Sequence, residues 1–176
     1  SREVQFSMLV EPALLLSLAA LAAQSQSLSL TNLYADPFAV GPAAAPPLVL
    51  VALALLVVLL TENARIPVDD PNTHLELTMI HEVMVLDHGG VDLAFIHYAA
   101  SLKLWVLGSL LVGLALPVRT GYPLADLALG LGGLLALAVI VGVIESAMAR
   151  LRLVRLTQLL VTASVLSLLA VIWVMR

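Results

Sequence analysis

The sequence predicts an all-α fold: a polytopic membrane helix bundle with five transmembrane helices and one acidic cytoplasmic loop. Of its 176 residues, 61% are hydrophobic and 11% are charged, whereas roughly 25% of the residues in an average soluble protein are charged. The mean hydropathy is +1.08. The apolar runs carry Leu, Ala and Val on every side instead of alternating apolar and polar residues, which excludes a transmembrane β-barrel.

Five runs of the chain are apolar enough, and long enough or nearly so, to cross the membrane. A helix needs roughly 20 residues to span about 30 Å of hydrocarbon. We expect spans at about 6–23, 43–60, 93–117, 124–149 and 155–175, within a single membrane domain of residues 1–176. The chain begins at Ser1 without a Met or a signal peptide. We therefore expect it to be the C-terminal piece of a longer protein.

The connections between the spans differ in charge, and the charge predicts their side of the membrane. The segment from Gln24 to Pro47 is polar and then proline-rich, without helical or strand periodicity. If the helices alternate in direction, one side carries Arg2, Arg65, Arg150, Arg152 and Arg155, and the other carries Arg119 and Arg176. The positive-inside rule then places loop 61–92 and the turn at 150–155 in the cytoplasm, in a protein of the cell (inner) membrane.

The cytoplasmic loop holds most of the polar chemistry of the chain. The thirty residues from Thr61 to Gly90 include ten ionisable groups. Pro67 and Pro71 bias the residues before them away from the helical region. A helix is then expected to begin at Thr73, in a Ser/Thr-x-x-Glu capping box, and to end at Gly89-Gly90. A helix at this place, beside the membrane surface, is usually amphipathic, but this one has no clean apolar face. A helix with polar and apolar residues on all sides is suited to packing between the bundle and a soluble partner.

The histidines of this loop do not form a recognisable metal site. His81 and Glu82 resemble the start of an HExxH zinc motif, but Val85 stands where the second His is required. The three loop histidines recur every seven residues, about 10 Å apart on a helix, which is too far for two of them to share one metal. We expect no metal site. The candidates for an interface with a partner are His74, His81, Asp87 and His88.

Acidic residues also lie inside or at the ends of the spans. Glu11 and Glu145 are each expected about 7 to 8 Å inside the cytoplasmic boundary, as two buried acids at one depth. An ionisable group there costs about 2.5 to 3.5 kcal/mol. They form a proton path from the loop into the bundle, or each pairs with a neighbouring arginine or reaches the interface. Asp126 begins the fourth span on the outer side, where a carboxylate caps free helix amides.

Lys103 is the one lysine of the sequence. If residues 93–102 belong to the same helix as the apolar run after it, Lys103 lies well inside the bundle and needs an acidic partner. If the helix enters the membrane near Ser101, Lys103 reaches the cytoplasmic interface by extending its side chain. Both interpretations stay open at this point.

Three stretches carry a family resemblance: ENARIPVDDPNTHLELTMIHE, with SREVQFSMLVEPALLL before it and AASLKLWVLGSLL after it. The chain resembles formate hydrogenlyase subunit 4 (hydrogenase-4 component C), a membrane subunit of group 4 NiFe-hydrogenase complexes. That family is related to subunit 1 of NADH:quinone oxidoreductase, whose acidic loop begins with a similar E-x-x-R-x-P pattern, here Glu62 to Pro67. Beyond that proline, THLELTMIHE is of the hydrogenase type.

The resemblance implies a subunit of about eight helices, of which this chain covers the last five. Its partners would be hydrogenase large and small subunits, an iron–sulfur subunit and antiporter-like membrane subunits, which the chain joins within the lipid bilayer. The NiFe centre and the iron–sulfur clusters would lie on partner subunits, since this chain has no cysteine. We expect no cofactor or catalytic centre in the chain itself, and no nucleic acid partner because it has no basic stripe. The proton-coupling candidates are charged residues of the loop and of the spans: Glu11, Glu62, Arg65, Asp69, Asp70, Glu76, Glu82, Lys103 and Glu145.

Two other functions compete with a hydrogenase role. A quinone-site-forming subunit 1 of a respiratory NADH:quinone oxidoreductase-like complex would require an apolar cavity that opens to the lipid beside the loop. A stand-alone secondary transporter usually has inverted repeats and broken helices, and no repeat is visible in this sequence.

Overall fold

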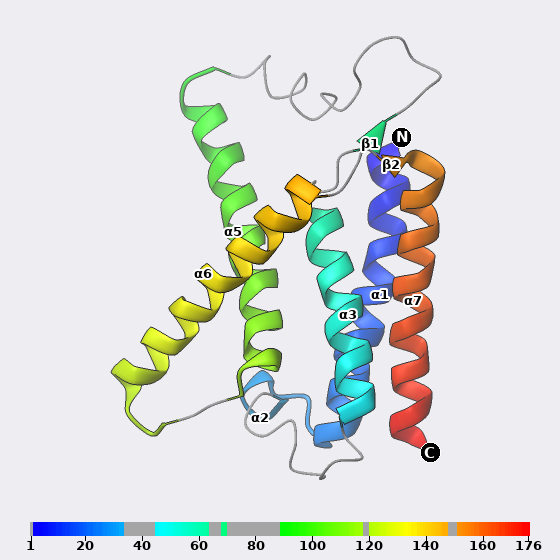
Figure 1. Cartoon of the computed structure of the whole chain (residues 1–176), viewed down its shortest axis with the longest axis vertical. Helices are drawn as coiled ribbons and strands as arrows, with labels where there is room; N and C mark the ends of the chain where they lie inside the picture. Colours follow the sequence, from blue (N-terminus) through cyan, green and yellow to red (C-terminus); the bar gives the residue numbers. More distant parts are fainter. Residues whose placement is uncertain (1, 34–44, 64–67, 70–88, 118–119, 148–150) are drawn as a thin grey trace.

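Five long helices make up most of the computed structural model of the chain (Figure 1). The structure describes residues 2–33, 45–63, 68–69, 89–117, 120–147 and 151–176, and side chains within 8–32, 45–63, 89–117, 120–147 and 157–176. The long helices are α1 (Arg2–Ser25), α3 (Ala45–Glu62), α5 (Val91–Ala115), α6 (Pro123–Ala147) and α7 (Leu153–Met175). All five are long and apolar enough to cross a membrane. The predicted all-α, five-span fold class is confirmed.

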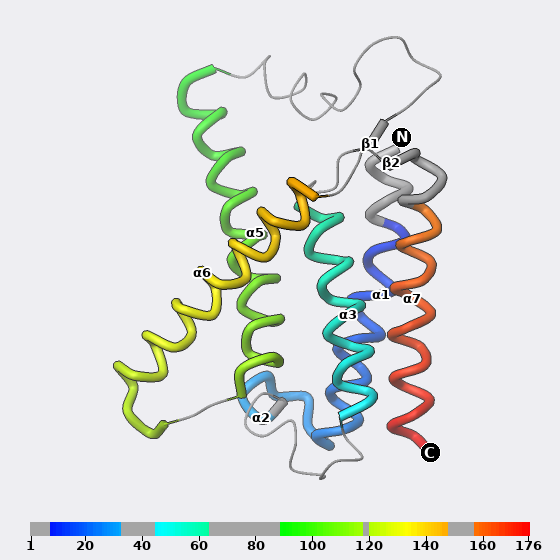
Figure 2. The backbone as a smooth tube through the Cα atoms, in the orientation of Figure 1, coloured from blue at the N-terminus to red at the C-terminus, as the bar shows by residue number. Residues whose placement is uncertain are grey.

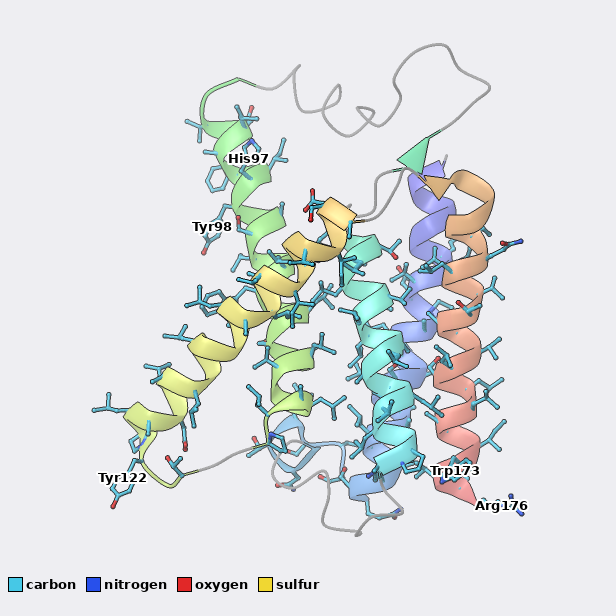
Figure 3. All side chains as sticks on the ribbon, viewed as in Figure 1. His97, Tyr98, Tyr122, Trp173 and Arg176 are labelled. Carbon is cyan, nitrogen blue, oxygen red and sulfur yellow. The ribbon has the colours of Figure 1, made fainter. Side chains whose placement is uncertain are left out.

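The helices alternate in direction, so the bundle has two distinct ends (Figure 1). We call the end at which α3 finishes and α5 begins the loop end, and the opposite one the far end. The turn between α6 and α7 also lies at the loop end. At the far end, Tyr122 beside α6 is 74% exposed and Trp173 on α7, close to Arg176, is 56% exposed (Figure 3). Aromatic residues with a polar tip are typical of the boundary between lipid and water.

Three short elements were not expected from the sequence. A single helical turn, α2 (Leu30–Leu33), lies in a segment predicted to lack helix; Asn32 Nδ2 donates to Ser27 Oγ there at 3.2 Å, which steadies the turn. Strands β1 (Val68–Asp69) and β2 (Leu151–Arg152) pair in parallel, with Asp69 opposite Arg152. This pairing joins the acidic loop to the turn between α6 and α7.

Helices α1, α3 and α7 form one closely packed group (Figure 2). Ala13 on α1 and Ala163 and Ala170 on α7 are fully buried. Small side chains allow membrane helices to approach closely, and van der Waals contact then holds them together. One polar contact also crosses this group, since Ser164 Oγ donates to the Leu9 carbonyl oxygen at 3.5 Å.

The other two helices cross each other at a pair of glycines. A Cβ atom built on Gly133 of α6 would lie 2.5 Å from Val112 Cγ1 of α5, and one built on Gly108 of α5 would lie 3.1 Å from Leu134 Cδ2 of α6. The close crossing therefore depends on both glycines. Away from it α6 leans outward, and its loop end returns to α3, where Val141 packs near Leu59 (Figure 2).

Candidate functional site

The splayed arrangement of α3, α5 and α6 encloses a cavity of about 1290 Å³. Apolar residues of α5 and α6 form most of its wall, and Val10 of α1 contributes one side chain. The polar lining residues come from the end of α3 and the residue after it, from the first half of α5 and from the last turn of α6: Thr61, Glu62, Asn63, His97, Ser101, Lys103 and Glu145. The site is thus an apolar cavity whose polar groups gather close to the acidic loop.

An ion pair between Glu62 and Lys103 is the central feature of this polar group. Glu62 is the last residue of α3 and its side chain is 17% exposed, whereas Lys103 is 48% exposed. Lys103 is the thirteenth of 25 residues in a continuous α5. The helix therefore includes residues 93–102, and Lys103 has an acidic partner, as the first interpretation requires, but its half-exposed side chain does not lie well inside the bundle.

In the last turn of α3, the side chains on either side of Glu62 form hydrogen bonds with the backbone of the helix. Thr61 Oγ1 donates to the Val57 carbonyl oxygen at 2.7 Å, and Asn63 Nδ2 donates to the Leu59 carbonyl oxygen at 2.8 Å. The Leu59 carbonyl oxygen also accepts a hydrogen bond from Asn63 N at 3.2 Å, so the Asn63 side chain is a second donor to that oxygen. The residues on either side of Glu62 thus hold the helix end, and the Glu62 carboxylate is directed to α5.

The start of α5 is set by a glycine turn. Gly90 precedes the helix with φ 62° and ψ −119°, a left-handed φ that residues with a Cβ rarely adopt. On the helix that follows, His97, Ser101 and Leu104 line the cavity from one face, at the spacing i, i+4, i+7. His97 lies in the part of α5 nearest the loop end (Figure 3). It was not among the predicted site residues, although this spacing with respect to Leu104 is visible in the sequence.

Glu145 lines the same cavity from α6. It is exposed, so the expectation that the protein buries this acid is wrong, and it stands instead at the polar part of an open cavity. Two basic residues, His97 and Lys103, and two acids, Glu62 and Glu145, from three different helices therefore line the cavity. Because Lys103 is 48% exposed, solvent screens part of the interaction between these charges.

Glu11 is not part of this group. The sequence predicted a buried acid at the depth of Glu145, but Glu11 lies on an exposed face of α1 and does not line the cavity. Its neighbours Val10 and Ala13, 2% and 0% exposed, face α3 and α7 instead. Because successive residues of a helix are 100° apart, packing on the Val10 and Ala13 side turns Glu11 outward.

The remaining predicted residues divide into two groups. Asp126 lies in the first turn of α6, and its carboxylate accepts hydrogen bonds from Thr120 N at 2.8 Å and Thr120 Oγ1 at 2.7 Å. It therefore holds the turn before the helix, whereas capping of the helix's own amides was expected. The backbone of Asp69 lies in β1. The other loop candidates and the predicted helix from Thr73 lie outside the described residues: Arg65, Asp70, His74, Glu76, His81, Glu82, Asp87 and His88.

Comparison with known proteins places this arrangement in one family. A family model described as NADH dehydrogenase matches residues 1–175 of the chain. Searches of curated proteins and of solved structures gave no match. The matched family is that of the subunit 1 type of the membrane arm of complex I. The chain therefore belongs to the NADH dehydrogenase family and is a multi-pass membrane subunit of a complex I-like oxidoreductase.

Proposed function

We propose that the chain is the membrane anchor and proton-coupling subunit of an energy-converting hydrogenase of the formate hydrogenlyase type. In this role it links a redox arm, with the hydrogenase large and small subunits and an iron–sulfur subunit, to antiporter-like ion-pumping subunits in the inner membrane. The choice of the hydrogenase branch rests on the loop sequence THLELTMIHE. The choice of a coupling role rests on the Glu62–Lys103 ion pair at the polar part of the cavity.

The ion pair supports coupling because of where it lies. Glu62 ends α3, and the acidic loop begins directly after it. A redox event in the attached arm changes charge or hydrogen bonding in this loop, and a change there acts at close range on the Glu62 carboxylate. When Glu62 takes up a proton or turns away, Lys103 loses its partner beside a largely apolar wall. The Lys103 ammonium group can then attract the Glu145 carboxylate, which lines the same cavity.

The first experiment identifies the partners of the chain. A tagged copy is purified from its native membrane in mild detergent, and the proteins that accompany it are identified by mass spectrometry. Hydrogenase large and small subunits with antiporter-like proteins support the proposal. NADH dehydrogenase subunits in their place overturn the hydrogenase assignment but leave the coupling role open to the next experiment.

The second experiment tests coupling in the intact complex. Lys103→Gln and Glu62→Gln are compared with Arg176→Gln, which removes a charge at the far end. We expect the first two variants to keep electron transfer but lower the number of protons translocated per electron, and Arg176→Gln to leave both unchanged. A paired Glu76→Gln and Glu82→Gln variant applies the same measurement to the loop. Full proton translocation in the Lys103 and Glu62 variants contradicts the role of the ion pair.

One observation favours the quinone-site-forming function as a second candidate. That function requires an apolar cavity beside the loop, and the cavity between α5 and α6 is largely lined by apolar side chains next to the polar groups of the loop end. Extraction of the purified complex with organic solvent, followed by chromatography, tests for stoichiometric quinone. Bound quinone together with NADH dehydrogenase subunits establishes this candidate, and a quinone-free complex with hydrogenase subunits excludes it.

A further inference from the structure

A short parallel sheet joins two segments of the chain that each follow an acid of the cavity. Val68 of β1 is the register partner of Leu151 of β2. Val68 lies six residues after Glu62, and Leu151 lies six residues after Glu145. Both acids line the cavity. The sheet therefore connects the start of the acidic loop with the turn after α6, at the loop end of the bundle (Figure 1).

The two helix ends that carry these acids also meet through an apolar contact inside the bundle. Leu59 and Leu60 of α3 form a buried cluster with Val141 of α6. Each of these residues lies about one turn or less before the acid of its own helix. Along the chain, Glu62 and Glu145 thus stand between an apolar contact on one side and the sheet on the other.

Helix α6 has few other attachments. Of its residues, all of which the structure describes, Gly133 and Val141 are the buried ones. Gly133 lies at the crossing with α5, and Val141 lies in the cluster with α3. The last turn of α6, which carries Glu145, lies beyond both contacts. Its position therefore depends on the segment that follows it, which includes β2.

Helix α7 supports the sheet. A pairing of two residues in each strand is weak in water, and a parallel pairing is slightly weaker than an antiparallel one. Strand β1 contacts α7 as well as β2, and β2 leads directly into α7 at Leu153. Because α7 packs closely against α1 and α3, the sheet fastens the start of the acidic loop and the turn after α6 to the closely packed part of the bundle.

We propose that the β1–β2 sheet is the positioning element of the site, which holds the segments that follow Glu62 and Glu145 in one arrangement around Lys103. The inference rests on the proposed coupling function and adds a second connection to it. A change in the acidic loop reaches Glu62 directly through the end of α3, and reaches Glu145 through the sheet and the end of α6.

Disulfide formation tests the pairing in the complete complex. The chain has no cysteine, so Val68→Cys with Leu151→Cys introduces its one pair of thiols. Neighbouring strands lie about 4.8 Å apart, within the range of about 4.4 to 6.8 Å over which a disulfide joins two Cα positions. Val68→Cys with Arg176→Cys, at the far end, is the control. After mild oxidation, we expect mass spectrometry to find an intrachain linked peptide for the first pair alone. Its absence overturns the proposal.

A distance measurement tests positioning without any reference to proton translocation. Genetically encoded spin-labelled residues replace Thr61 and Ser146, which are adjacent to the two acids, and pulsed electron paramagnetic resonance gives their separation in the purified complex. Leu151→Pro removes a backbone N–H and fixes φ, which opposes the pairing. Leu28→Pro, at a 91% exposed position after α1, is the control. We expect the distance distribution to broaden with Leu151→Pro alone. An unchanged distribution overturns the positioning role.

Proton translocation per electron tests whether the sheet serves coupling. We expect Leu151→Pro to keep electron transfer but lose proton translocation, and Leu28→Pro to change neither. The oxidised pair of cysteines at Val68 and Leu151 should keep the parent ratio, because the disulfide holds the strands together. If Leu151→Pro fails to assemble, Val68→Gly with Leu151→Gly weakens the pairing without a proline.

Two results of this measurement contradict the positioning role. Full translocation in the variants that weaken the pairing shows that the sheet is not needed, and a lowered ratio in the oxidised pair shows that the strands must separate. A parent complex that translocates no protons contradicts the proposed function instead, and the distance measurement then decides the positioning role by itself.

Discussion

Substitution of Gly133 by alanine tests the crossing of α5 and α6, which forms the wall of the cavity. The added Cβ would meet Val112 Cγ1 at 2.5 Å and Leu116 Cδ1 at 3.0 Å. Leu116 can move its side-chain end at small cost. Val112 cannot do so easily, because a β-branched residue in a helix has one strongly preferred rotamer. The helices must therefore move apart or Val112 must adopt a strained rotamer.

Gly132 supplies the matched control for the magnitude of this effect. No atom lies within 4 Å of a Cβ built at Gly132, so Gly132→Ala changes only the helix propensity of α6. Overpacking typically costs about 1 to 3 kcal/mol. We expect the free energy of unfolding of Gly133→Ala to lie below that of Gly132→Ala by this amount. Val112→Ala removes the contacting methyl group, so combining it with Gly133→Ala should recover most of the loss.

Reversible unfolding of the purified protein in mixed micelles with increasing SDS, followed by circular dichroism, gives these free energies. The four proteins needed for the cycle are the parent, Gly133→Ala, Val112→Ala and the double variant. A coupling energy between the two sites of less than about 0.5 kcal/mol is the level found for independent sites. Such a value, or equal stability of Gly133→Ala and Gly132→Ala, would show that the helices do not cross at this glycine.

Three further predictions use the same measurement. For Glu62→Gln and Lys103→Gln, a double-mutant cycle should give a coupling energy of about 0.2 to 1 kcal/mol, since the half-exposed Lys103 loses part of the attraction to solvent screening; zero coupling contradicts the ion pair. Thr120→Val removes the Oγ1 hydrogen bond to Asp126 and should cost about 0.5 to 1.5 kcal/mol, and it should cost less in an Asp126→Ala background, where that hydrogen bond is already absent. Gly90→Ala should cost about 1 to 2 kcal/mol because φ is +62° there, whereas Gly89→Ala, at an open position without a positive φ, should cost less; equal effects would refute the turn at Gly90.

The membrane-spanning segments could be predicted from the sequence because hydropathy reports the length of an apolar run directly. The strands at Val68–Asp69 and Leu151–Arg152 could not, since two residues are too few to show a period of two. Their pairing also depends on the return of α6 to the loop end, which is a tertiary feature. The helical turn at Leu30–Leu33 was missed because four residues make only about one turn, which is too short to show a helical period.

The candidate site was predicted only in part. Glu62 and Lys103 were both named, but nothing in the sequence indicated that they pair, because the orientation of α5 relative to α3 comes from packing. His97 was not predicted, because a single histidine in an apolar run gives no sign of the face on which it lies. Glu11 was predicted to be a buried acid, whereas the structure shows it on an exposed face of α1.

The error at Glu11 has a physical cause that also bears on the function. In a soluble helix the apolar face points to the core, but in a membrane both the lipid-facing and the protein-facing sides are apolar, so hydropathy gives depth and not direction. Direction is revealed only by residues that tolerate one environment, such as Gly133 at a close crossing. Glu62 pairs with Lys103 within the chain, whereas Glu11 faces outward from it. The same hydropathy therefore describes both an acid that pairs inside the bundle and an acid on its surface.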